Sequence, residues 1–221
     1  MQDTDQDKAE PAMDMSERPF NRRGIIGRPF HRAGAVRDAR SVRLADGASV
    51  LLRAVNSGGR DDDAFQRLFY TLSDTTRYLY FCAGIPATPL WAERFGALSR
   101  TDNERSYVLV AAVGDELVGF ARFSQGPHAE PHERAADLGV LLTDSWQGRR
   151  LGGYMLCRLA TEALARGLTT LTAVTMWENR RMLRLARRIF PDVHITFASG
   201  TCELTVDLES WWAKQDEQLC G

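Results

Sequence analysis

Residues 146–153 read Trp146-Gln147-Gly148-Arg149-Arg150-Leu151-Gly152-Gly153. This stretch follows the short apolar run 135–142, which is typical of a buried strand, and precedes residues 154–166, in which apolar residues recur at helical spacing. A glycine-rich turn that opens a helix exposes unpaired backbone N–H groups at the positive end of the helix dipole, an arrangement that binds phosphate. The two adjacent arginines add charge suited to bidentate phosphate contacts. The stretch therefore predicts a ligand that carries a pyrophosphate.

Other kinds of loop compete with this interpretation. An ordinary strand-to-helix connection has the same spacing and stays open as an alternative. A dinucleotide-binding fingerprint needs G-x-G-x-x-G, which the loop lacks. A P-loop needs Gly-Lys-Ser/Thr, whereas the only lysines of the chain are Lys8 and Lys214.

Two motifs resemble those of the GNAT N-acetyltransferase superfamily. The run Gln147–Gly152 is similar to the Q/R-x-x-G-x-G/A loop that holds the pyrophosphate of acyl-CoA in that family. Downstream, the run Glu178-Asn179-Arg180-Arg181-Met182-Leu183-Arg184-Leu185-Ala186-Arg187-Arg188 resembles the second motif, in which an asparagine opens the helix after the fifth strand. The resemblance is closest to the bacterial protein lysine acetyltransferases, the Pat-like branch, and covers roughly residues 46–206.

This resemblance implies an α/β fold with a central mixed sheet of about seven strands flanked by helices. It also implies acetyl-CoA as the co-substrate, with the pantetheine arm lying along the strand before the loop like an added strand. Asn179 would hold the pantetheine or an ordered water, in addition to capping its helix. The residues expected to bind the co-substrate are Val140, Leu141, Leu142, Gln147, Gly148, Arg149, Arg150, Leu151, Gly152, Gly153 and Asn179.

The chain also departs from the GNAT pattern. Arg150 occupies the place of the first motif glycine, so the closest backbone approach to the pyrophosphate carries a side chain. Gly152 keeps the second glycine, at which we expect an added side chain to face the pyrophosphate. Ala186 occupies the position of the tyrosine that many members use as general acid. After the helix that contains Ala186, the chain has Phe190-Pro191 in place of the usual Gly-Phe.

Asp137 is the candidate catalytic residue. Transfer of an acetyl group from a thioester to an amine needs a base that removes a proton and donors that stabilise an oxyanion. Asp137 lies on the strand before the loop, where Pat-like enzymes place a catalytic glutamate. An acid in an apolar strand is costly to bury unless it is paired, which also favours a function. The alternative is an aspartate that points to solvent or pairs with an arginine.

Hydrophobic patterns predict an alternation of strands and helices along the folded part of the chain. We expect strands over 41–44, 49–55, 106–113, 116–124, 135–143, 168–175, 194–198 and 203–206. We expect helices over 61–72, 88–98, 154–166, 179–189 and 208–218. Aromatic residues near the first two helices are expected to build the core and the rim of an acceptor cleft; they are Tyr78, Tyr80, Phe81 and Trp91.

Composition limits the function classes. The 221 residues are 44% hydrophobic and carry a formal net charge of -1, which suits one domain with a proper core. Residues 1–40 lack hydrophobic periodicity, being first acidic and then basic, and are predicted to form a disordered tail before the acetyltransferase domain 41–221. Because the acids cancel much of the field of the basic half, nucleic acid is not an expected partner. No apolar run reaches membrane-spanning length, and the scattered cysteines indicate reduced thiols and a cytoplasmic location.

The leading function is an acetyl-CoA-dependent N-acetyltransferase that acts on a primary amine, either a protein lysine or a small amine. The alternative is a non-catalytic acyl-CoA-binding sensor or interaction module with a degenerate GNAT site. His128 and His132 are either auxiliary bases or exposed loop residues, and with Glu130 and Glu133 they fit no standard metal site, so no metal is predicted. Oligomeric state stays open, with a homodimer as one alternative.

Overall fold

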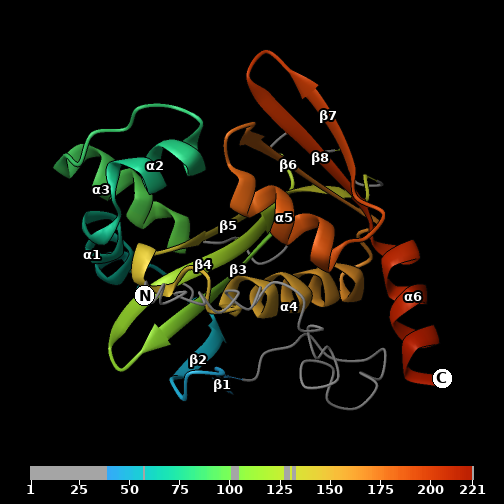
Figure 1. Ribbon diagram of the computed structural model, residues 1–221. Coiled ribbons are helices and arrows are strands. Elements are labelled where there is room, and N and C mark those ends of the chain that lie inside the picture. Colours follow the sequence, from blue (N-terminus) through green and yellow to red (C-terminus); the bar gives the residue numbers. More distant parts are fainter. Residues whose placement is uncertain (1–38, 57, 101–104, 127–129, 131–132, 221) are drawn as a thin grey trace, which may run out of the picture.

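The protein forms one open sheet with helices on both faces (Figure 1). The computed structural model describes residues 39–56, 58–100, 105–126, 130 and 133–220, with the backbone alone for 216–220. The predicted disordered tail lies outside the described residues, except for its last two positions, where Arg40 begins the first strand. His128 and His132 also lie outside them.

In the described residues, eight strands make up the sheet, close to the number of about seven that the resemblance implied. In spatial order they are β1 (Arg40–Arg43), β2 (Ser49–Ala54), β3 (Ser106–Val113), β4 (Glu116–Ser124), β5 (Ala135–Leu142), β6 (Thr170–Met176), β8 (Thr201–Asp207) and β7 (His194–Ala198). Neighbouring strands pair antiparallel, with the exception of β5 and β6, which are parallel. The predicted order of strands and the mixed α/β class are confirmed.

The same described ranges contain six α-helices, together with short 3₁₀ turns over 97–99 and 144–146. The helices are α1 (Asp62–Thr71), α2 (Asp74–Phe81), α3 (Pro89–Gly96), α4 (Leu151–Ala165), α5 (Arg180–Ile189) and α6 (Leu208–Cys220). Five were predicted, and α2 was missed because its β-branched and aromatic residues favour helix weakly. The Ser73 side chain caps α2 by accepting from the Thr76 N–H at 3.1 Å.

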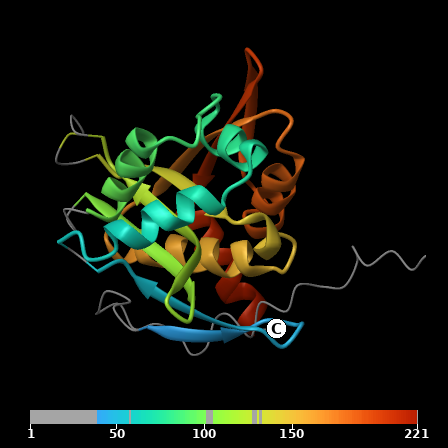
Figure 2. The same cartoon turned by 90° about the vertical axis from the view of Figure 1, so that its left-hand side faces the viewer.

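One face of the sheet packs on α1 and α3 (Figures 1 and 2). Aromatic rings fill this layer: Phe65 of α1 lies 5.4 Å from Phe120 of β4 and 5.9 Å from Phe95 of α3, measured between ring centroids. Leu141 of β5 belongs to the same layer. This side of β5 therefore also carries Gly139 and Asp137, because side chains alternate along a strand.

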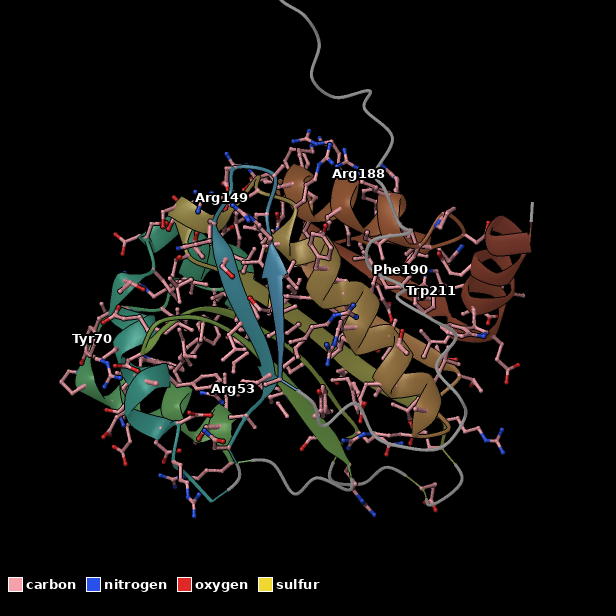
Figure 3. The ribbon with its side chains drawn as sticks, turned by 90° about the horizontal axis from the view of Figure 1, so that it is seen from below. Arg53, Tyr70, Arg149, Arg188, Phe190 and Trp211 are labelled. Carbon is pink, nitrogen blue, oxygen red and sulfur yellow. The ribbon has the colours of Figure 1, made fainter. Side chains whose placement is uncertain are left out.

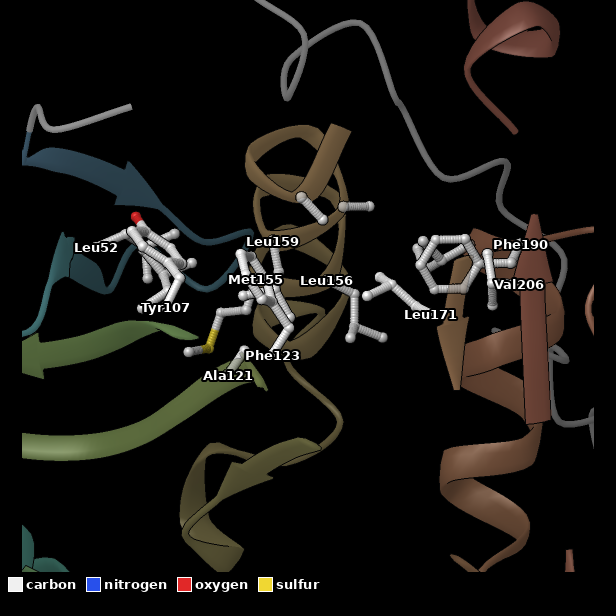
Figure 4. Close-up of a cluster of buried hydrophobic side chains, with 14 of the residues drawn as sticks. Leu52, Tyr107, Ala121, Phe123, Met155, Leu156, Leu159, Leu171, Phe190 and Val206 are labelled. Carbon is white, nitrogen blue, oxygen red and sulfur yellow. The ribbon is translucent and has the colours of Figure 1, made fainter. Parts of the chain in front are cut away.

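The opposite face packs on α4, which lies across the middle strands (Figure 4). Met155, Leu156 and Leu159 of this helix are fully buried against the sheet. Next to α4, α5 covers β6 and β8 through Leu183 and Ala186. The indole N–H of Trp211 in α6 donates to the Ile189 carbonyl at 2.9 Å and fixes the end of α5.

Replacement of Phe65 by alanine is expected to lower the free energy of unfolding by about 3–5 kcal/mol, because it leaves a cavity among packed rings. Urea denaturation of the full chain measures this. The control is Tyr70→Ala on the same helix, where the side chain is 51% exposed and the expected loss is about 1 kcal/mol or less. Equal losses in the two variants would contradict this description of the aromatic layer.

Candidate active site

The strands β5 and β6 part in the middle of the sheet. Their parallel register runs only from Ala135–Thr170 to Asp137–Thr172, although both strands continue beyond it. On its other edge β5 stays paired with β4 as far as Leu142. Within the described part of the chain, residues 138–142 thus have a strand partner on one edge alone. Backbone groups on the free edge can bind an extended ligand as an added strand.

The predicted pyrophosphate loop lies directly after this free edge. Gly148 has a φ of 76° and Arg150 a φ of 67°, both in the left-handed region. The backbone thus adopts at Arg150 the conformation for which the motif glycine is suited, at a cost of about 1–2 kcal/mol for a residue with a Cβ. Arg150 is the N-cap of α4, and its side chain makes no capping bond. First-turn N–H groups of α4 remain suited to an anion.

Side chains of this loop hold it to the surrounding elements. Gln147 donates to the Leu142 carbonyl at 3.0 Å and to the Thr76 hydroxyl at 3.2 Å, and it accepts from Arg181 at 2.8 Å. Arg149 pairs with Asp46 at 2.7 Å and lies over the Trp146 ring at 4.3 Å. The Asp46 carboxylate therefore partly neutralises the charge of Arg149. Arg150, in contrast, is exposed to solvent.

Gly152 has a different role from the expected one. A Cβ at this buried position would meet Leu185 Cδ2 at 3.2 Å and Leu142 Cδ1 at 3.7 Å. The expectation that an added side chain would face the pyrophosphate is wrong, because the position faces the packing between α4, α5 and β5. Glycine lets α4, α5 and β5 approach closely beneath the loop, and this packing supports the position of the loop.

Asp144 fastens α2 to the same loop. Its carboxylate accepts from the Ser73 hydroxyl at 2.9 Å, the Thr76 hydroxyl at 2.9 Å and the Ser73 N–H at 3.3 Å. Partial burial by itself would raise the pKa of Asp144, but these hydrogen bonds outweigh it and hold the pKa below its usual value. The contact joins residues about seventy positions apart, so sequence patterns carried no signal for it.

Asp137 lies at the last paired position before the strands part. Its side chain is exposed and accepts a hydrogen bond from the Thr172 hydroxyl at 2.9 Å. The expectation of a costly buried acid is therefore wrong, and the solvent-facing alternative describes its position. Ser124 of β4 is its register partner and accepts from Arg122 at 2.5 Å. Polar side chains of β4, β5 and β6 therefore lie around the position at which β5 and β6 separate.

Tyr80 of α2 lies over β5 close to these side chains. A Cβ on Gly139 would be 3.0 Å from the Tyr80 hydroxyl oxygen. Burial raises the pKa of Tyr80, and the guanidinium of Arg122, the register partner of Gly139, lowers it only in part. The phenol therefore keeps its proton at neutral pH.

Beyond β5, the same face of the sheet is open to solvent. Val174 of β6 is 60% exposed, and its register partner Glu203 is exposed as well. Asp137 is therefore open to solvent from this face.

Asn179 caps α5, as its sequence position predicted. Its side-chain oxygen accepts from the Met182 N–H at 3.1 Å, and its side-chain nitrogen donates to the Thr175 hydroxyl at 3.0 Å. Contact with pantetheine stays a prediction for this residue.

The helix α5 carries exposed arginines along its length, and Arg181 near its start donates to Gln147 of the loop. The exposed arginines are Arg180, Arg181, Arg184, Arg187 and Arg188. Arg149 and Arg188 reach outward on the same side of the molecule (Figure 3). This side is therefore strongly basic and suits a ligand with several phosphates.

In the residues that the structure describes, no three His, Cys, Asp or Glu side chains gather as metal ligands. None of the helices in these same ranges is both long and apolar enough to cross a membrane.

Comparison with known proteins agrees with this geometry. The family model of the acetyltransferase (GNAT) family matches residues 68–190, more than half of the chain. The chain belongs to the GNAT acetyltransferase family. The matched GNAT segment contains α2, the parted strand β5, the loop and α5, which supply most residues of the candidate site.

Solved structures share the GNAT fold at low sequence identity. The GNAT domain of Pat from S. lividans superposes with a TM-score of 0.67 at 22% identity, covering 82% of this chain and 99% of that one. The structure of yncA from Salmonella typhimurium, solved with its cofactor acetyl-CoA, superposes with a TM-score of 0.54 at 16% identity. That match covers 73% of this chain and 95% of the other. The cAMP-binding acyltransferase from Mycobacterium smegmatis superposes with a TM-score of 0.50 at 19% identity. That match covers 77% of this chain and 47% of the other.

Replacement of Asp144 by asparagine is expected to lower stability at neutral pH and to have no effect in strong acid. A carboxylate whose pKa is lowered on folding stabilises the fold above its unfolded pKa of about 3.9, and this contribution is lost as the pH falls through the folded pKa. Urea midpoints of the two proteins should therefore differ at pH 7 and converge as the pH falls through the lowered pKa that Asp144 has in the folded protein. Asp115→Asn, at an exposed turn, is the control. A difference independent of pH would show that the carboxylate charge is not the cause.

Proposed function

We propose that this chain is an acetyl-CoA-dependent N-acetyltransferase that transfers the acetyl group to a primary amine. The observation that carries the proposal is the early end of the pairing between β5 and β6. It comes directly before a loop that contains left-handed residues and leads into the N-terminus of α4. A linear ligand that ends in a pyrophosphate matches this arrangement, since it needs one strand-like edge and one anion site in line. Acetyl-CoA has this form.

The residues divide the binding of acetyl-CoA between them. Backbone groups of 138–142 would pair with the amides of pantetheine, and the N–H groups at the start of α4 would hold the pyrophosphate. Arg150 and the exposed arginines of α5 would contact the phosphates. Gln147, Arg149 and Gly152 act through the shape of the loop, because their contacts are with the protein itself.

The chemistry proposed is direct attack of the amine on the thioester carbonyl. Asp137 would take the proton of the amine, through a water molecule because its side chain is short and exposed. Backbone N–H groups near Val140 would stabilise the oxyanion. A protein lysine is the favoured acceptor, since the open sheet face beside Asp137 offers room for a large substrate and Glu203 attracts a cation.

A non-catalytic acyl-CoA sensor is the second candidate. Two observations favour it: Ala186 occupies the place of the usual general acid, and Thr172 donates to the carboxylate of Asp137. Consumption of acetyl-CoA in the presence of lysine-containing peptides and small amines distinguishes the candidates, because a sensor binds the thioester without consuming it.

Replacement of Arg150 by glycine is expected to weaken acetyl-CoA binding about tenfold, the scale of one charge-assisted hydrogen bond. Glycine accepts the left-handed backbone without strain, so the loop keeps its shape. Calorimetric titration measures the affinity, and Arg67→Ala, which removes an exposed arginine from α1, is the control of equal charge. Equal affinities in the two variants would contradict a phosphate contact at Arg150.

Replacement of Asp137 by asparagine should leave acetyl-CoA affinity nearly intact and lower kcat by about 10²-fold or more, the usual scale for a positioned base. Steady-state kinetics with a peptide acceptor tests this. Asp115→Asn is again the matched control. An unchanged kcat at neutral pH would mean that another group or solvent takes the proton.

A further inference from the structure

Tyr80 has a position that the other tyrosines of the chain do not share. Tyr70 is exposed on α1, Tyr107 is buried in the core under α4, and Tyr154 belongs to α4 on the opposite face. Tyr78 precedes Tyr80 by two residues on α2, which places it about 200° around the helix. The hydroxyl of Tyr80 instead lies over Gly139, two residues past the point where β5 and β6 part. It is therefore on the same face as Asp137 and at the part of β5 along which the thioester would lie.

Three features keep the hydroxyl there. The ring packs edge-on against Phe120 at 5.6 Å and against Phe81 at 5.0 Å. Asp144 holds the first turn of α2, one turn before Tyr80. Gly139 leaves room, because a Cβ there would come within 3.0 Å of the hydroxyl oxygen. A glycine at this strand position has no turn or positive φ to explain it, so the space for the phenol is its evident role.

We propose that Tyr80 donates a hydrogen bond to the sulfur of coenzyme A as the thiolate leaves, with the Arg122 guanidinium supporting the negative charge. The inference rests on the proposed function. It assigns stabilisation of the leaving thiolate to a tyrosine on α2, because α5 has Ala186 where many family members have a tyrosine as general acid. The step is a hydrogen bond without proton transfer, because a buried phenol holds its proton more strongly than a thiol does.

The reaction balances in this form. The amine nitrogen bonds to the carbonyl carbon, and the carbonyl oxygen becomes an oxyanion. Asp137 accepts the proton of the nitrogen through water. The C–S bond then breaks, the carbonyl re-forms, and the electron pair goes to sulfur, where the Tyr80 O–H and Arg122 stabilise it. The thiolate takes a proton from solvent, and Asp137 returns its proton to solvent.

Tyr80→Phe removes the donor and keeps the ring. We expect kcat to fall about 10- to 100-fold, the scale of one hydrogen bond to a charged group, while the Kd of acetyl-CoA changes less than about twofold. Tyr70→Phe is the control and should match the unaltered protein. Full activity in Tyr80→Phe, with an active unaltered protein, would overturn the inference and leave the proposed function standing. No acetyl-CoA consumption by the unaltered protein would overturn the proposed function.

A second measurement is independent of turnover. Product coenzyme A bound to the protein is titrated with base, and the ultraviolet absorbance of the thiolate reports the pKa of its thiol. The Tyr80 donor should lower that pKa, so Tyr80→Phe should raise it by about one unit, which is a tenfold change in the ionisation constant. A purely structural role of the ring leaves this pKa equal in the two proteins, and that result would overturn the inference.

Gly139→Ala gives the same test from the strand. Its Cβ should displace the hydroxyl and reduce kcat in the unaltered background, but reduce it far less in a Tyr80→Phe background, since the donor is already absent. Additive losses would mean that the two residues act separately and would contradict the proposal.

Discussion

The early end of the β5–β6 pairing is the constraint on which the site depends. Two parallel strands that stayed paired along their full length would leave no backbone groups for a ligand, and the loop would then be an isolated anion site. Parting after Asp137 gives one continuous track from the free edge of β5 to the N-terminus of α4. At the start of that track Asp137 is exposed on the face away from α4, from which the proposed acceptor would approach it.

Small residues keep that track in place by allowing close packing. Gly152 brings α4 against Leu185 and Leu142, and Gly139 admits Tyr80 over the strand. Arg150 is the exception, since it adopts a left-handed backbone that suits glycine. Strain of this kind persists where the surrounding contacts fix the chain, here through the neighbouring loop side chains. The left-handed backbone at Arg150 places a basic, exposed side chain at the proposed phosphate site.

The helix α2 couples the two halves of the site. Its first turn binds Asp144 beside the loop, and its last turn carries Tyr80 over β5. Displacement of the loop would therefore move the phenol, and binding of a pyrophosphate would steady both. This coupling explains how a helix of eight residues with weak helical propensity is held in one place.

The strand and helix order, the glycine-rich turn before α4 and the cap at Asn179 could be predicted from the sequence, because each depends on neighbours within a few positions: hydrophobic period, glycine placement and side-chain capping. The sequence also placed Asp137 directly before the loop. It did not show that this aspartate faces solvent, that Gly152 faces α5, that Arg149 pairs with Asp46 or that α2 exists. Each of these depends on contacts between residues far apart in the chain. Local patterns fix the elements and their order, whereas the direction in which each side chain points at the site is decided only when the elements pack together.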